Sequence, residues 1–341
     1  MPKALRYLLY SLAALLLFLL SAIGAMLLIC RSCDTTCPPG PIGPNGAARL
    51  RQHVEMLCAA PRYGDTKQQA RNYIAEQFRR AGWHVELQYF TNDSGETHCN
   101  ISARRPGKSE ARYIIGAHYD ACDTDAGNPG ADDNASAVAV LLELARRLPA
   151  TEMQYGLELV AWDCEEPPYF DTADMGSAHH AATCTPQQVK GLICLEMLGY
   201  YSDAPGSQPT LFPGHSLLLP TVGNFIAVIG DWHSIGLSRD AYNALRREMP
   251  TLRLNIPCAH GTELWFSDHR NYAPRGIPSI MLTDTSMLRN SHYHEPTDTP
   301  DTLNYEAMER ATRGILRLVQ TLSHHTPFHR FQSFIKLEAL Q

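Results

Sequence analysis

Apolar and polar positions along residues 47–325 follow two periodic patterns, one typical of helices and one typical of strands. Helical spacing of apolar residues predicts helices over 48–58, 67–82, 135–148, 238–249 and 305–323. Period-two alternation or short apolar runs predict strands over 83–90, 99–106, 111–120, 156–166, 189–198, 223–231, 252–259 and 277–284. Strands that alternate with helices indicate an α/β fold. We therefore expect a single globular domain over 47–325, with a mixed, mostly parallel central sheet flanked by helices on both faces.

The N-terminal segment has a different pattern, because residues 8–29 contain no charged side chain. A helix that spans a bilayer needs about 20 apolar residues. Lys3 and Arg6 precede the segment, and positive charge favours the cytoplasmic side. This predicts a cytoplasmic stub over 1–7 and a transmembrane signal anchor over 8–30. The catalytic part of the chain would then be membrane-anchored and exocytoplasmic, either periplasmic or extracellular.

The alternative for this segment is a cleaved signal peptide with "SAIGA" as its small-residue site. Apolar residues continue past that point through "MLLI", which favours the uncleaved anchor. Residues 31–46 are rich in Pro and Gly and predict a linker, and residues 326–341 predict a C-terminal tail.

The composition is that of a globular protein, with 44% hydrophobic and 19% charged residues in a chain of 341. The formal net charge is −6 and no basic run is interleaved with aromatic residues, which argues against nucleic acid as a partner. The 10 cysteines do not form paired C-x-x-C zinc motifs, and their disulfide pairing cannot be deduced from the sequence.

Residues that can bind metals or move protons gather where the predicted strands end. In chain order they are His118, Asp120, Asp132, Asp133, Glu165, Glu166, Glu196, His292 and His294. Ligand sites of open α/β sheets lie at the carboxyl ends of the strands, so we expect these side chains to meet there.

Carboxylate and imidazole ligands without thiolates suit zinc at an open, catalytic site. Several carboxylates crowded together repel one another unless cations neutralise them, and two metal ions bridged by one carboxylate are a known solution. An adjacent Glu-Glu pair can supply one ligand and one general base. Asp120 lies two residues after His118, on the same face of a strand, where it can orient the imidazole.

Five motifs taken together resemble the co-catalytic di-zinc aminopeptidase family, whose relatives include glutamate carboxypeptidase-type ectodomains and glutaminyl cyclases. They are H-x-D, G-A-D-D-N-A-S, E-E, L-E-M and H-Y-H-x-P-x-D-T-P-D-T-L. The resemblance covers 47–325 and implies the phosphorylase/hydrolase-like zinc exopeptidase fold.

The resemblance also implies two Zn²⁺ ions per chain and assigns their ligands. The implied metal ligands are His118, Asp133, Glu166, Glu196 and His294. His118 and Glu196 would hold one ion, Glu166 and His294 the other, and Asp133 would bridge both. Asp133 is preferred to Asp132 because the bridging residue of the family lies three positions before a Ser, and His294 is preferred to His292 by the H-x-x-x-D-T spacing.

For the reaction, the resemblance implies Glu165 as general base and Asp120 as the residue that orients His118. A cis peptide bond is implied between Asp133 and Asn134. Glu165 would take a proton from a water held between the metals and later return it to the leaving amine.

The expected function is therefore that of a zinc exopeptidase, specifically an aminopeptidase that acts on peptides with a free N-terminus. Two alternatives stay open: a single-zinc, glutaminyl-cyclase-like acyl transfer on the same scaffold, and a receptor-like ectodomain without enzymatic activity. Relatives of the second kind typically lose ligands, whereas every ligand position is filled here.

Some residues near the motifs have no assigned chemistry. Asp132 is expected to be structural. Asp268 and His269 are expected to support the ligands from the next layer of residues, to line the substrate rim, or to be plain loop structure. Cys122 and Cys164 are expected to form a disulfide or remain buried thiols. His179, His180, His324 and His325 are expected to be solvated.

Overall fold

A computed structural model describes residues 31–35, 45–92, 94–124, 127–209, 219–256 and 265–324. The predicted cytoplasmic stub, the predicted anchor over 8–30 and the predicted tail over 326–341 lie outside these residues. Within the described part of the chain, no helix is both long and apolar enough to cross a membrane.

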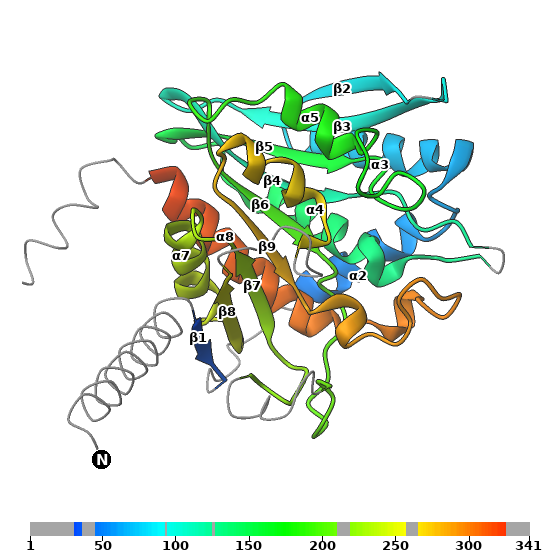
Figure 1. The fold of residues 1–341 in the computed structure, drawn as a ribbon, viewed down its shortest axis with the longest axis vertical. Coiled ribbons are helices and arrows are strands. Elements are labelled where there is room, and N and C mark those ends of the chain that lie inside the picture. Colours follow the sequence, from blue (N-terminus) through cyan, green and yellow to red (C-terminus); the bar gives the residue numbers. More distant parts are fainter. Residues whose placement is uncertain are drawn as a thin grey trace, which may run out of the picture.

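Nine strands of the described residues form one sheet in the order β1-β8-β7-β9-β6-β4-β5-β3-β2, which descends in Figure 1 from β2 at the top to β1 at the lower left. In chain order the strands are β1 (Arg31–Asp34), β2 (His84–Thr91), β3 (Thr97–Arg105), β4 (Ser109–His118), β5 (Tyr155–Trp162), β6 (Val189–Glu196), β7 (Ile226–Gly230), β8 (Thr251–Asn255) and β9 (Ser279–Thr283).

The sheet is mixed, with a parallel centre. β5, β4, β6 and β9 are parallel neighbours, as are β7 and β8. The pairs β1–β8, β2–β3, β3–β5 and β7–β9 are antiparallel. Half of the pairings are therefore antiparallel, so the expectation of a mostly parallel sheet holds only for the central strands.

Five helices cover one face of the sheet and contact one another: α2 (Gly46–Leu57), α3 (Gln68–Arg80), α4 (Ala137–Arg147), α7 (Ile235–Leu245) and α8 (Tyr305–His324). Their apolar stripes and the facing strand residues form the larger core. The opposite face carries the short helix α5 (Gly176–Ala182) and short 3₁₀ turns over a smaller core. Among the described residues, helices therefore cover the two faces of the sheet unequally, with five on one face and one short helix on the other (Figure 1).

Two elements were not predicted from the pattern. β1 lies inside the range expected to be linker, yet it pairs with β8 as an edge strand. Its four residues are too few to show alternation, and the pairing exists only because β8 offers a free edge. α5 lies in a stretch without helical periodicity and is supported by packing against β2, β3 and the turn Asp268–Asn271.

The parallel centre decides where the polar motifs lie. β4 ends at His118, β6 ends at Glu196, and β5 is followed within four residues by Glu165 and Glu166. Because these strands run in the same direction side by side, their carboxyl ends share one edge of the sheet.

Candidate metal and catalytic site

Asp133 lies at the centre of the site, with its two carboxylate oxygens facing different partners. Oδ1 is 3.2 Å from Nε2 of His118, and Oδ2 is 3.1 Å from Nε2 of His294. The residue belongs to the irregular turn Ala131–Ser136 that precedes α4, and its peptide bond with Asn134 is cis, as the resemblance predicts. One buried carboxylate thus joins two groups of potential ligands.

The first group lies at the ends of β4 and β6. Nε2 of His118 is 3.6 Å from Oε2 of Glu196 and 3.8 Å from Oε2 of Glu165. His118 and Glu196 are buried, with exposed fractions of 1% and 5%.

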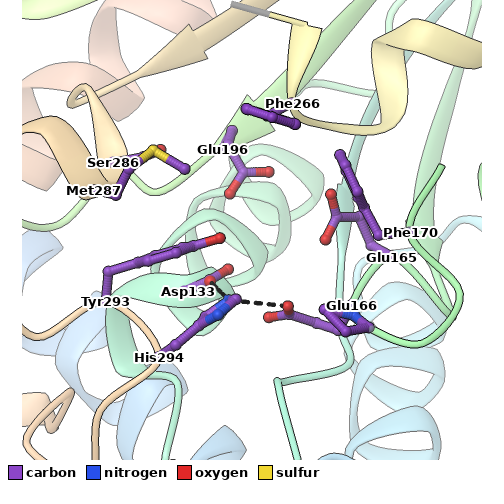
Figure 2. A pocket seen from close by; sticks show the side chains of 11 residues that line it. Asp133, Glu165, Glu166, Phe170, Glu196, Phe266, Ser286, Met287, Tyr293 and His294 are labelled. Atoms are coloured by element: carbon purple, nitrogen blue, oxygen red, sulfur yellow. Dashed lines mark ion pairs between the residues drawn. The ribbon is translucent and has the colours of Figure 1, made fainter. Parts of the chain in front are cut away.

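The second group comes from the loops after β5 and β9. Nε2 of His294 is 3.0 Å from Oε2 of Glu166 (Figure 2). Figure 2 shows that the side chains of Asp133, Glu166 and His294 point toward one another, while Glu165 and Glu196 face the same hollow from above.

The electrostatics of the site require additional positive charge. Burial raises the pKa of Glu165 well above its usual value, and the neighbouring Glu196 and Glu166 raise it further. Burial likewise raises the pKa of Glu166 to about 8, with Asp133 adding to the rise. Burial alone would raise the pKa of Asp133 too, but the adjacent His118 and His294 rings lower it below its usual value. The carboxylates outnumber the imidazoles, so a divalent cation would relieve their repulsion.

The donor atoms also fit a metal. Nε2 of His118, Nε2 of His294 and Oε1 of Glu166 are buried and make no well-formed hydrogen bond within the described part of the chain. Buried polar atoms are normally satisfied, so such atoms require an explanation. Imidazole nitrogens and carboxylate oxygens are the ligands of catalytic zinc. The residues present therefore fit zinc.

Asp120 contacts residues of both donor groups. Its Oδ1 is 3.4 Å from Nδ1 of His118, on the side of the ring away from Asp133. Its carboxylate also accepts hydrogen bonds from the backbone N–H groups of Glu165 and Glu166, at 3.2 and 3.1 Å. Asp120 therefore holds the His118 ring and the backbone of the Glu-Glu pair in one arrangement.

Arg62 is a positioning residue that the sequence analysis missed. Its side chain is 1% exposed, and its guanidinium donates hydrogen bonds to the carbonyl oxygens of Tyr119, Pro129 and Gly130 at 2.9, 2.8 and 2.6 Å. These carbonyls belong to the end of β4 and to the loop before Asp133. A single arginine in a turn carries no sequence signal for such a role.

Asp298 supports the same turn from the C-terminal side of the chain. Its carboxylate accepts hydrogen bonds from the backbone N–H groups of Asp132 and Asp133, at 2.9 and 3.1 Å. The Asp132 carboxylate accepts from Nδ2 of Asn290 at 2.7 Å and from the backbone N–H of Gly199 at 2.8 Å. Asp132 is thus bound within the fold and does not face the donor groups.

Ser267 holds Glu196 in place. Its Oγ donates a hydrogen bond of 2.6 Å to Oε2 of Glu196, the oxygen that faces His118. The neighbouring Asp268 and His269 are fully buried, so neither lies on the rim of the site. Burial raises the pKa of Asp268 to about 7.

Three other expectations are settled by the structure. His292 faces away from the donor groups, with Nδ1 2.8 Å from the hydroxyl of Thr297. Cys122 and Cys164 are both free thiols. The prediction that His180 is solvated is wrong: it is 2% exposed. α5 packs it against the sheet, where Nε2 lies 3.1 Å from Oε1 of Glu158.

A mixed α/β sheet with buried imidazole and carboxylate donors at the carboxyl ends of its central strands is typical of a metal-dependent enzyme. The profile of peptidase family M28 matches residues 100–319, and the chain belongs to this family.

Similar proteins include both peptidases and cyclases. The chain is 42% identical over 262 residues to the uncharacterized protein YfbL of Escherichia coli K12, covering 75% of this chain and 80% of YfbL. It is 25% identical over 220 residues to leucine aminopeptidase 1 of Emericella nidulans, covering 61% of this chain and 51% of the relative.

Two solved structures illustrate the shared fold. A Zn-dependent exopeptidase from Parabacteroides distasonis superposes with a TM-score of 0.60 at 20% identity, over 82% of this chain and 99% of its own. A glutaminyl cyclase from Porphyromonas gingivalis has a TM-score of 0.62 at 18% identity, over 81% of this chain and 98% of its own. At these identities the likeness concerns the fold alone.

Proposed function

We propose that this protein is an aminopeptidase that holds two zinc ions. His118 and Glu196 would bind one ion, Glu166 and His294 the other, and Asp133 both. The observation that carries the proposal is the placement of the two Asp133 oxygens, each about 3 Å from the imidazole of a different donor group. When bound, zinc would supply Lewis-acid polarisation of the scissile carbonyl and activation of a water molecule.

Glu165 acts as the general base in this proposal. It lies beside the donor groups and faces the pocket, where its carboxylate can accept a proton from a water molecule and return it to the leaving group (Figure 2). Glu165 accepts the proton of the attacking water and passes it to the leaving amine. Asp120 holds the Glu165 backbone and the His118 ring in place while Glu165 accepts and then returns the proton.

The pocket beside the site favours an apolar N-terminal side chain. It has a volume of about 170 Å³, and the side chains of Phe170, Phe266, Met287 and Tyr293 line it together with the carboxylates. A substrate with a free α-amine would place its positive charge among the carboxylates and its first side chain against these apolar groups. Leucyl and phenylalanyl substrates should therefore be preferred to charged ones.

The test is a metal count joined to an activity assay on the full chain, purified in detergent. We expect two zinc ions per chain, cleavage of leucyl p-nitroanilide that a chelator abolishes, and a loss of about 10²–10⁴ in kcat for Glu165→Gln. Glu152→Gln is the matched control, because this exposed carboxylate forms an ion pair with Lys108 and is not among the described residues that line the pocket. One zinc with cyclisation of N-terminal glutamine would instead assign the protein to glutaminyl-cyclase chemistry. A chain that binds no metal and acts on neither substrate would refute both enzymatic assignments.

We further propose that the catalytic domain acts outside the cytoplasm, tethered by residues 8–30. The support is the uncharged stretch 8–29 with Lys3 and Arg6 before it. Protease added to intact cells, or to spheroplasts for a periplasmic location, should digest the domain. Protection until the membrane is lysed would contradict this orientation.

A further inference from the structure

A free thiol lies beside the second donor group. Cys122 follows Asp120 by two residues, just past the end of β4, and is 9% exposed. Its Sγ, a carboxylate oxygen of Glu166 and a ring nitrogen of His294 all lie within 4.8 Å of one another. Neither the motif resemblance nor the proposed function gives this thiol a role.

The neighbouring atoms of the proposed metal site also indicate a ligand at this place. Oε1 of Glu166 is buried in a side chain that is 3% exposed, and it has no hydrogen bond within the described residues. Nε2 of His294 is also a buried atom without a hydrogen bond in the described residues, although the His294 side chain as a whole is 24% exposed. A thiol, an imidazole nitrogen and a carboxylate oxygen around one point make a donor set for zinc.

The three donor atoms are grouped closely enough to approach one ion. Zinc binds sulfur at about 2.3 Å and nitrogen or oxygen at about 2.0–2.2 Å, usually in a tetrahedron, so donors on one ion are roughly 3.5 Å apart. The three atoms lie within 4.8 Å of one another, so binding of one ion would draw their side chains together.

A second cluster of potential donors, around the thiol of Cys164, differs because a cation already lies in it. Cys164 lies close to His98 and Asp163, but the ammonium of Lys67 already occupies that place. Its Nζ is 2.9 Å from Nδ1 of His98, 2.8 Å from Oδ1 of Asp163 and 3.8 Å from Sγ of Cys164. A lysine cation satisfies that cluster, whereas the described residues place no lysine or arginine against Cys122, Glu166 and His294.

We infer that Cys122 is an additional ligand of the second metal position, where its sulfur bonds the ion as the thiol proton leaves to solvent. The inference rests on the proposed metal site. The second position would then have four protein donors, namely Asp133, Glu166, His294 and Cys122. The first would keep three, His118, Glu196 and Asp133, with a place open for substrate. Closed four-ligand sites are typical of structural zinc and open ones of catalytic zinc, so the two positions would differ in role.

Cobalt substitution tests the inference, because a thiolate on Co²⁺ gives a sulfur-to-metal charge-transfer band that oxygen and nitrogen ligands lack. The metal-free full chain is titrated with Co²⁺, and the visible d–d bands report binding separately from the near-ultraviolet band. We expect both features in the wild type and in the control Cys164→Ser. In Cys122→Ser and Cys122→Ala the charge-transfer band should be lost while the d–d bands persist.

Metal affinity gives a second readout. Competition with a chromogenic chelator should show a loss of at least about tenfold at one of the two positions in Cys122→Ser, the scale at which even outer partners of a ligand act. Visible bands without a charge-transfer band in the wild type would overturn the role of Cys122 and leave the metal site intact. No visible bands at all would overturn the metal site and the inference with it.

Discussion

Replacing Arg62 by Met should loosen the metal site without touching any proposed ligand. The arginine is buried beneath the end of β4, and its hydrogen bonds go to carbonyl oxygens and to Sγ of Cys58, with no carboxylate among the partners given for the described residues. Methionine fills a similar volume but donates no hydrogen bond. The carbonyls of Tyr119, Pro129 and Gly130 would lose their donors inside the protein.

The magnitude follows from the three short hydrogen bonds, of 2.6, 2.8 and 2.9 Å. At about 1.5 kcal/mol each, the lower end for bonds to a charged group, they sum to roughly 4–5 kcal/mol of unfolding free energy. This is a large part of the 5–15 kcal/mol that typically stabilises a domain. Arg62→Lys retains the charge and some donors but not the planar fork, so it should lose about half as much.

The assay is urea unfolding of the metal-free chain followed by intrinsic fluorescence, together with zinc affinity for each variant that folds. The order of stability should be wild type, Arg62→Lys, Arg62→Met, and zinc affinity should fall in the same order because the Asp133 turn is no longer held. A loss below about 1 kcal/mol in Arg62→Met would refute the reasoning. It would mean that water or the remaining contacts hold the turn equally well.

Three further predictions concern other parts of the structure. Met287→Ala should lower kcat/KM for leucyl and phenylalanyl substrates by about tenfold while alanyl substrates change little, and equal losses on all three would contradict an apolar pocket. Ser267→Ala removes the donor to Glu196 and should weaken zinc binding by about 10–100-fold in chelator competition, whereas unchanged affinity would show that Glu196 needs no such support. Burial alone would lower the pKa of His180, but its contacts with Cys184 and Glu158 raise it to about 9. The protonated His180 should therefore stabilise the fold by about 3 kcal/mol below pH 6.5, and this stabilisation should be lost as the pH rises through 9. His180→Gln should abolish this pH dependence in urea unfolding measured across the range.

Most elements of the fold could be predicted from the sequence because their signal is local. α4 and α8 show the apolar period of a helix buried on one side, and β4 and β6 are apolar runs that end in a polar residue. β1 could not be predicted, because an edge strand of four residues forms only when a distant partner strand is present. Sheet direction was only partly predicted, since a one-dimensional pattern does not show that β7 reverses beside β9.

The residues of the candidate site also divide into those that the sequence predicted and those that it did not. His118 and Glu196 were predicted because the sequence places them at strand ends, and parallel strands bring such ends together. Asp133 and His294 lie in loops and were assigned through the family resemblance. The motif spacing of the family that the chain resembles also favoured Asp133 over Asp132 and His294 over His292 as metal ligands. In the structure Asp133 and His294 face the donor groups, while Asp132 and His292 bond elsewhere.

Only the tertiary structure decided which side chains support these donors. The hydrogen bonds of Arg62, Ser267 and Asp298 join residues from about 60 to more than 160 positions apart, and no local pattern marks them. The same applies to Cys122, whose distance from Glu166 and His294 depends on how three loops fold over the sheet. Sequence periodicity reports which side of an element is buried, but contacts between distant segments exist only once the chain has closed around them.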